Sequence, residues 1–291
     1  MPDFFKHLDL MKNRNSLMLV LPLLLAMVTG CTSQMAGTDR YEPLIAQDGK
    51  DVMWMPTANE IVTEMLEMAQ VTPVDLVYDL GAGDGKIAIE AARRYGARAV
   101  GIEYNPDMAA LARRNAQQAG VSDRVTIVTG DIFQEDFSNA TVVTLYLLTE
   151  LNIRLKPTIQ NMKPGTRIVS NTFAMGAWTP DAVILSKGEP SGYFWIVPAK
   201  VGGRWQLSEL PGLGSAQLNI TQKSQKFDAQ LTFASNAPQQ IEGSLKGTQL
   251  TFDYLDAKGQ SQRFVGEVGA NKIHGSIQNI SNSVVTATRV P

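Results

Sequence analysis

The chain has 291 residues, of which 44% are hydrophobic and 19% charged, and its formal net charge is −2. This length exceeds the roughly 100 to 200 residues of a typical domain, so we expect two folded units. The small net charge, without a long basic or acidic run, gives no electrostatic reason to expect a nucleic-acid partner.

Residues 1–31 have the pattern of a targeting segment. Basic residues up to Arg14 precede an apolar stretch over 16–28, which is shorter than the roughly 20 residues that a membrane-spanning helix needs. The following letters, VTGC, resemble the site at which a bacterial lipoprotein signal is cut before the cysteine that carries the lipid. We therefore expect lipid attachment at Cys31 and a linker over 32–52. An uncut inner-membrane signal anchor is the alternative.

Cysteine and histidine usage restricts the chemistry. Cys31 is the only cysteine, which excludes disulfides, cysteine metal sites and a buried cysteine nucleophile. The two histidines, His7 and His274, lie outside the expected catalytic domain, which argues against a Ser-His-Asp hydrolase and a histidine metal site. No acid cluster stands out at a spacing that suits magnesium, so we expect no metal site.

Residues 53–200 alternate between strand and helix patterns. Helical spacing of apolar residues predicts helices over 59–71, 85–96, 106–120 and 149–162. Short apolar runs predict strands over 74–80, 98–103, 124–131, 140–147, 167–173, 182–187 and 193–198. The alternation implies a parallel sheet covered on both faces. The last two strands have no helix between them and are expected to form an antiparallel hairpin.

Residues 201–291 have a different pattern. Short alternating runs such as FDAQLTF and TQLTFDY are separated by turns rich in Gly, Asn, Asp and Lys-Gly pairs. No segment has a helical period, and strands recur about every ten residues. This pattern predicts a small antiparallel sandwich or barrel.

The stretch DLGAGDG, residues 79–85, places a glycine at every second position after the first strand of the sheet. In a doubly wound sheet this loop comes closest to the ligand, and a side chain there would block it. The dinucleotide fingerprint needs a third glycine where Lys86 stands, which disfavours a pyrophosphate ligand. The stretch resembles instead the first motif of class I S-adenosylmethionine-dependent methyltransferases, an acidic residue followed by G-x-G-x-G. A tight strand-to-helix turn is the structural alternative.

The resemblance implies S-adenosyl-L-methionine as the cofactor. It places Asp79 near the methionine amine, Glu103 on the ribose hydroxyls and Asp131 near the adenine amino group, because these acids end three successive strands. The cofactor-binding residues that it implies are Asp79, Gly81, Ala82, Gly83, Gly85, Glu103, Tyr104, Asp131 and Ile132.

Two longer segments, 54–89 and 140–178, resemble the family that contains the ATP synthase c-subunit lysine methyltransferases and their bacterial relatives. The resemblance covers residues 53–200 and implies an α/β fold with a Rossmann-like seven-stranded methyltransferase sheet. The small antiparallel β domain over 201–291 is additional to that family. The implied activity is methyl transfer to an amine, with a lysine of a protein partner as the acceptor.

Methyl transfer is an in-line displacement at a carbon activated by positive sulfur, so alignment and removal of water supply most of the rate. A lysine acceptor must be neutral, and an apolar, aromatic mouth lowers its pKa by desolvation. The aromatic candidates are Tyr146, Trp178 and Trp54, and the polar candidates for positioning the amine are Glu150 and Asn152. Packing roles for Tyr146 and Trp178, and a helix-start role for Glu150, are the alternatives.

The expected compartment and the expected cofactor conflict, because S-adenosylmethionine is made in the cytoplasm and a cleaved lipoprotein faces outward. Thr32 lacks the aspartate associated with inner-membrane retention, so we expect a lipid anchor in the outer membrane, with the protein on its periplasmic face. An inner-membrane protein with its domain in the cytoplasm is the alternative. The alternative function is a non-catalytic envelope lipoprotein that binds a nucleoside-like ligand through a retained methyltransferase pocket.

Overall fold

The computed structural model describes residues 41–186 and 188–291. The lipoprotein-type signal over 1–31, with Cys31, and the first part of the expected linker lie outside the described residues. Within the described ranges, no helix combines the length and the apolar character needed to cross a membrane.

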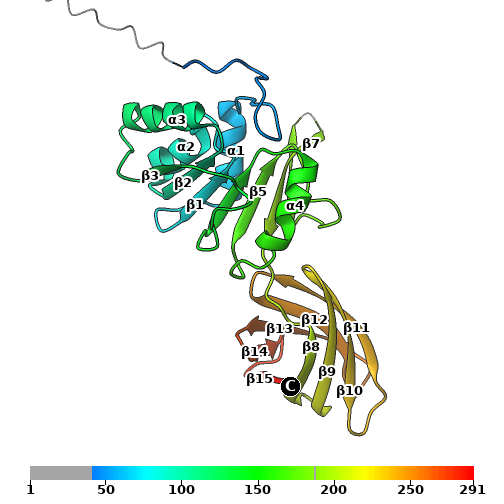
Figure 1. Cartoon of the computed structure of the whole chain (residues 1–291). Helices are drawn as coiled ribbons and strands as arrows, with labels where there is room; N and C mark the ends of the chain where they lie inside the picture. Colours follow the sequence, from blue (N-terminus) through cyan, green and yellow to red (C-terminus); the bar gives the residue numbers. More distant parts are fainter. Residues whose placement is uncertain (1–40, 187) are drawn as a thin grey trace, which may run out of the picture. The chain divides into compact units, whose positions relative to one another are not determined.

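A seven-stranded sheet has the strand order β3-β2-β1-β4-β5-β7-β6 (Figure 1). The first five strands of this order pair in parallel, and β7 pairs antiparallel with both β5 and β6. The strands are β1 (Leu76–Leu80), β2 (Arg98–Glu103), β3 (Val125–Thr129), β4 (Val142–Leu145), β5 (Arg167–Asn171), β6 (Ala182–Ser186) and β7 (Glu189–Ile196). The seven-stranded sheet and the closing antiparallel hairpin expected from the sequence are confirmed.

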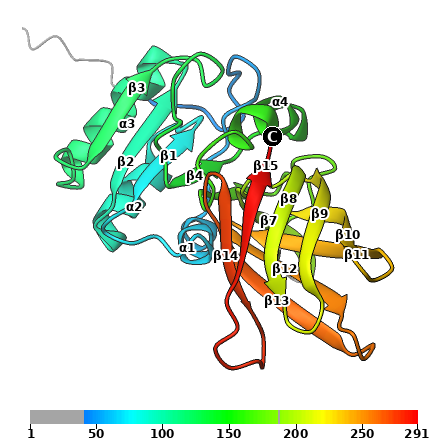
Figure 2. The same cartoon turned by 90° about the horizontal axis from the view of Figure 1, so that it is seen from below.

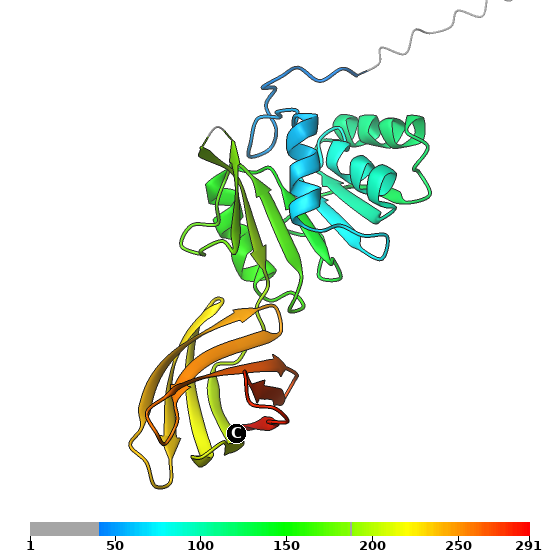
Figure 3. The ribbon, with the colours of Figure 1, turned by 180° about the vertical axis from the view of Figure 1, so that it is seen from behind.

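Four helices cover the two faces of this sheet, and they are α1 (Asn59–Met68), α2 (Lys86–Tyr95), α3 (Pro106–Gln118) and α4 (Thr149–Ile159). Apolar side chains of α1, α2 and α3 share one core cluster with the sheet, and those of α4 belong to a second cluster. Figure 3 shows the ribbon from behind, with α1 in blue in front of the sheet. Because both faces are covered, the central strands β1 and β4 are almost entirely buried. Strand order reverses between β1 and β4, which is where such sheets bind ligands.

A closed eight-stranded antiparallel barrel follows the sheet. Consecutive strands are neighbours, and the last strand pairs with the first, so the barrel has no free edge (Figure 2). The strands are β8 (Gly203–Leu210), β9 (Gly214–Lys223), β10 (Lys226–Phe233), β11 (Gln239–Lys246), β12 (Gln249–Leu255), β13 (Ser261–Val268), β14 (Lys272–Ile277) and β15 (Val285–Val290). Of the two architectures expected from the sequence, sandwich or barrel, the structure has the barrel.

The barrel interior is filled by side chains, as expected for eight strands. Large aromatic residues need space, and paired glycines provide it: Gly266 and Gly275 lie opposite each other on β13 and β14. A Cβ atom on Gly275 would lie 2.5 Å from the ring of Phe264 and 2.4 Å from the carbonyl oxygen of Val265. The sequence therefore keeps glycine where the Phe264 ring covers the backbone.

Replacement of Gly275 by alanine should destabilise the protein. The added methyl group meets a backbone oxygen and a buried ring, so we expect the free energy of unfolding to fall by about 1–3 kcal/mol. Urea unfolding followed by circular dichroism measures this loss. The matched control is Ser276→Ala, at the next, exposed position of β14. Equal stability of the two variants would contradict the packing argument.

Candidate functional site

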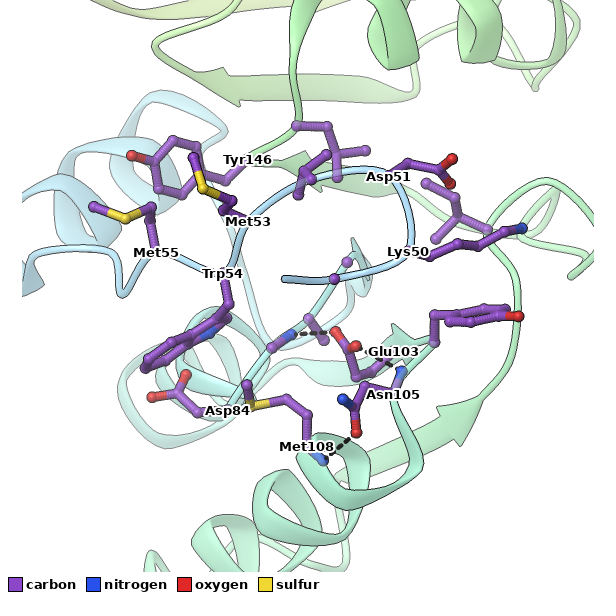
Figure 4. Close-up of a pocket in the computed structure, with 18 of the residues that line it drawn as sticks. Lys50, Asp51, Met53, Trp54, Met55, Asp84, Glu103, Asn105, Met108 and Tyr146 are labelled. Atoms are coloured by element: carbon purple, nitrogen blue, oxygen red, sulfur yellow. Dashed lines mark hydrogen bonds between the residues drawn. The ribbon is translucent and has the colours of Figure 1, made fainter. Parts of the chain in front are cut away.

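A cavity of about 450 Å³ lies at the carboxyl ends of β1, β2 and β4, at the point where strand order reverses (Figure 4). Eight of the nine residues expected to bind the cofactor line it, and they are Asp79, Gly81, Ala82, Gly83, Glu103, Tyr104, Asp131 and Ile132. The ninth, Gly85, does not line the cavity. It caps α2 in a left-handed conformation, and a Cβ there would lie 3.0 Å from the Cβ of Ala112 on α3. Gly85 therefore serves helix packing.

The loop after β1 turns sharply over the end of β2. The amides of Gly81 and Ala82 both donate to the carbonyl of Ile102, at 2.9 and 3.0 Å. Gly81 and Gly83 have φ values of +81° and +55°, which a residue with a side chain rarely adopts. This turn exposes bare backbone to the cavity.

Glu103 is held by backbone amides from two loops. Its Oε2 accepts from the amide of Gly83 at 2.8 Å, and its Oε1 accepts from the amide of Asn105 at 2.9 Å (Figure 4). Each carboxylate oxygen can accept a further hydrogen bond, so the group remains able to bind a pair of hydroxyls. The carboxylate is thus oriented without any ligand.

Asp79 is the last-but-one residue of β1, just before the glycine loop, and is 2% exposed. Burial raises the pKa of its carboxyl to about 7, although the hydroxyl of Thr144 donates to Oδ1 at 2.7 Å; the nearby acids Asp84 and Glu103 add to the increase. A buried carboxylate without a cationic partner is costly to ionise. The site is therefore suited to a ligand that brings a positive charge.

Asp131 follows β3, lines the cavity and has two partners. The amide of Phe133 donates to its Oδ1 at 2.9 Å, and the ammonium of Lys50 donates to its Oδ2 at 2.6 Å. The Lys50 hydrogen bond is the main reason that the pKa of Asp131 lies below its ordinary value. Lys50 falls in the segment expected to be a linker, so the sequence pattern did not point to this pair.

Residues 47–57 line the cavity, although residues up to 52 were expected to be linker. Among them is Trp54, one of the aromatic residues expected at the site: its indole nitrogen lies 2.6 Å from where a Cβ on Gly83 would be. The difference from the expectation arises because this segment has few apolar residues and forms its own hydrogen bonds, which no periodic pattern reveals.

One end of the cavity is apolar and aromatic. Tyr146, at the end of β4, stacks on Phe173 with ring centroids 6.4 Å apart and an interplanar angle of 27°. Leu148 and Leu151, at the start of α4, line the same cavity. Tyr146 lies where the sequence analysis placed it, whereas Phe173, which follows β5, was not anticipated.

The other three residues expected at the acceptor end lie elsewhere. Glu150 is exposed in the first turn of α4 and does not line the cavity. Asn152 is fully buried, because it shares the core-facing side of α4 with Leu155 and Ile159. Its Nδ2 donates to the carbonyl of Phe173 at 3.0 Å, so it supports a residue of the cavity wall.

Trp178 is 1% exposed and packs at a junction with the barrel. Its Nε1 donates to Oε1 of Gln225 at 2.9 Å, and Nε2 of Gln225 donates to the carbonyl of Thr179 at 2.6 Å. Gln225 lies in the turn between β9 and β10. Trp178 therefore does not lie at the mouth of the cavity, where it was expected, and its role is packing, the alternative expected from the sequence.

Metal ligands do not gather in the described parts of the chain: no group of three or more His, Cys, Asp or Glu residues there could hold an ion. Besides the acids and backbone amides, the lining of the cavity includes two lysines, Lys50 and Lys86, and the neutral polar residues Gln47, Thr57 and Asn105.

Comparison with known proteins assigns a family to this site. The family model described as the ANTKMT methyltransferase domain matches residues 79–182. This match ends before the barrel begins at Gly203. A solved structure described as an RNA methyltransferase from Salinibacter ruber in complex with S-adenosyl-L-homocysteine is 48% identical, with a TM-score of 0.49, and the match covers 50% of this chain and 96% of that one.

Two curated relatives are lysine methyltransferases. The adenine nucleotide translocase lysine N-methyltransferase of mouse is 34% identical over 136 residues, which are 46% of this chain and 57% of that protein. A protein-lysine N-methyltransferase of Saccharolobus islandicus is 46% identical over 135 residues, which are 46% of this chain and 84% of that protein. The chain therefore belongs to the ANTKMT-type family of protein-lysine N-methyltransferases.

Proposed function

We propose that this protein transfers the methyl group of S-adenosyl-L-methionine to the side-chain amine of a lysine in a protein partner. The observation that supports this proposal is the meeting of three strand-end acids, a bare glycine loop and an apolar aromatic wall around one cavity. The protein is an S-adenosylmethionine-dependent methyltransferase by family, and the acceptor is the proposed part. The names of its relatives favour an enzyme over a non-catalytic binding protein.

The residues of the cavity fit this cofactor. Glu103, already oriented by two amides, would accept hydrogen bonds from the ribose hydroxyls. The raised pKa of Asp79 suits a partner with an ammonium group, which the methionine part carries. Tyr104 and Ile132 flank the strand ends where the adenine ring would lie. When bound, the cofactor supplies an electrophilic methyl group.

The apolar end of the cavity suits the acceptor. Tyr146, Phe173, Leu148 and Leu151 supply few hydrogen-bonding groups, so a lysine entering there loses its water. Desolvation disfavours the ammonium form and so lowers the lysine pKa, which makes the nucleophilic amine available. The described lining includes no histidine, so the proton is expected to leave to solvent before the amine enters.

Methyl transfer to protein lysine is tested with the purified protein, S-adenosylmethionine labelled in its methyl group and an extract of the source cells. We expect label in protein, released as methyl-lysine on acid hydrolysis. Glu103→Ala should lose this activity, because two charge-assisted hydrogen bonds to the ribose are worth at least about a hundredfold in cofactor affinity. Calorimetry measures the affinity, and circular dichroism checks that the variant is folded. Label that ribonuclease removes, or no label, would contradict the proposal.

Cofactor affinity should depend on pH through Asp79. In the free protein the pKa of this carboxyl is about 7, and an ammonium partner lowers it. Full affinity is therefore present above pH 7. As the pH falls below 7, affinity should decrease, and the decrease approaches about tenfold for each pH unit. Calorimetric titration with S-adenosyl-L-homocysteine between pH 5.5 and 8.5 measures this slope. Asp79→Asn should bind weakly with a flat profile; a flat profile in the unaltered protein would refute the assignment.

We also propose that Cys31 carries a lipid that anchors the protein in the cell envelope. The support is the apolar stretch over 16–28 and the VTGC that follows it. Cells fed radioactive palmitate should label the protein, whereas Cys31→Ala should remain unlabelled. Absence of label from the unaltered protein would favour the uncut signal anchor and a domain in the cytoplasm.

A further inference from the structure

Residues 46–54 form a small hairpin that covers the cofactor cavity, named here the cover hairpin. The amide of Ala46 donates to the carbonyl of Trp54 at 3.0 Å, and the amide of Trp54 donates to the carbonyl of Gln47 at 2.9 Å. The tip closes through the amide of Gly49 and the carbonyl of Val52, at 3.0 Å. Figure 4 shows the segment that carries Lys50 and Trp54 passing over the cavity. Because these backbone hydrogen bonds are internal, the hairpin can move without losing them.

The cover hairpin is attached weakly to the rest of the protein. No residue from 41 to 56 is buried, and the first buried position along this segment is Thr57. The apolar side chains of Met53 and Met55 remain 58% and 45% exposed. Segments with few buried apolar contacts open at low free-energy cost. The hairpin is therefore held by a few specific contacts.

Those contacts lie at the tip and at the base of the hairpin. On one side the ammonium of Lys50 pairs with Asp131 at 2.6 Å and lies 4.8 Å from the centroid of the Tyr104 ring. On the other side Trp54 lies against Gly83, which has no side chain to displace it. Beyond Trp54, the ammonium of Lys86 donates to the carbonyl of Thr57 at 2.7 Å, which fixes the point where the chain enters the fold.

Lys50 uses groups that the proposed cofactor also needs. Asp131 is the acid expected to accept from the adenine amino group, and Tyr104 follows the ribose-binding acid at the end of β2. The ammonium of Lys50 contacts both of these residues. It donates to the same carboxylate to which the adenine amino group would donate. Lys50 and the adenine therefore compete for one acceptor.

We propose that the cover hairpin is a gate on the cofactor site and that Lys50 is its latch, holding the gate closed on Asp131 until the adenine end of the cofactor displaces it. This inference rests on the proposed function, because that function assigns Asp131 to the adenine. The latch must be weak to be displaced. The side chains of Lys50 and Asp131 are 34% and 21% exposed, and pairs in contact with water contribute little stability.

The latch should respond to salt. The hydrogen bond to Asp131 raises the pKa of Lys50, and the same pair lowers the pKa of Asp131, so both groups stay charged around neutral pH. Added salt screens an exposed pair of charges, whereas the adenine contact involves a neutral amino group. Salt is therefore expected to favour the cofactor over Lys50.

The test is the binding of S-adenosyl-L-homocysteine to the intact protein, measured by calorimetry and by stopped-flow tryptophan fluorescence, because Trp54 lines the cavity. We expect Lys50→Ala to bind about two- to fivefold more tightly, the range that an exposed ion pair supports, through faster association. Between 50 and 500 mM sodium chloride, the affinity of the unaltered protein should rise relative to that of Lys50→Ala. The matched control is Lys163→Ala, which removes another exposed lysine and should change neither property.

Equal or weaker binding by Lys50→Ala would overturn the latch, since weaker binding means that Lys50 helps to retain the cofactor. Glu103→Ala separates this failure from failure of the proposed function. If Glu103→Ala loses binding while Lys50→Ala matches the unaltered protein, the cofactor site stands and only the latch is wrong. If Glu103→Ala binds normally, the cofactor assignment itself is wrong.

Discussion

The carboxylate of Glu103 joins the two loops between which the cavity is built. One oxygen accepts from Gly83 in the loop after β1, and the other from Asn105, the residue that caps α3. Without this carboxylate, two backbone amides at the strand ends would lose their partner, which is costly at a partly buried site. The same group that is expected to recognise the ribose thus maintains the loop geometry, so preorganisation and recognition depend on one side chain.

Electrostatics divide the cavity into three regions. The buried carboxyl of Asp79 favours a cationic ligand group, the partly buried Asp131 is neutralised by Lys50, and the end formed by Tyr146 and Phe173 is apolar. A sulfonium cofactor and a neutral amine acceptor need such an arrangement, because charge must be balanced at one end and water removed at the other. The apolar end resembles the core in composition, which explains why its residues are hard to distinguish from packing residues in the sequence.

The sequence predicts those features that depend on local pattern. The strands, the four helices and the meeting of strand-end acids follow from apolar periodicity and from the rule that parallel strands end at one edge. It does not predict contacts between distant segments with no periodic pattern. Trp178 is held by Gln225, 47 residues later, in the barrel; Lys50 is held by Asp131, 81 residues later, at the cavity. A tryptophan or a lysine carries no local sign of such a partner.

The closure of the barrel has a consequence for how the chain reaches its native state. β8 and β15 are hydrogen-bonded neighbours, although Gly203–Leu210 and Val285–Val290 lie at opposite ends of the barrel sequence. Joining them requires a long loop of chain to close, which makes this pairing slow compared with the hairpins between consecutive strands. During synthesis, one edge of β8 stays unpaired until β15 has left the ribosome. That interval is when the polypeptide is most exposed to edge-to-edge association with other chains.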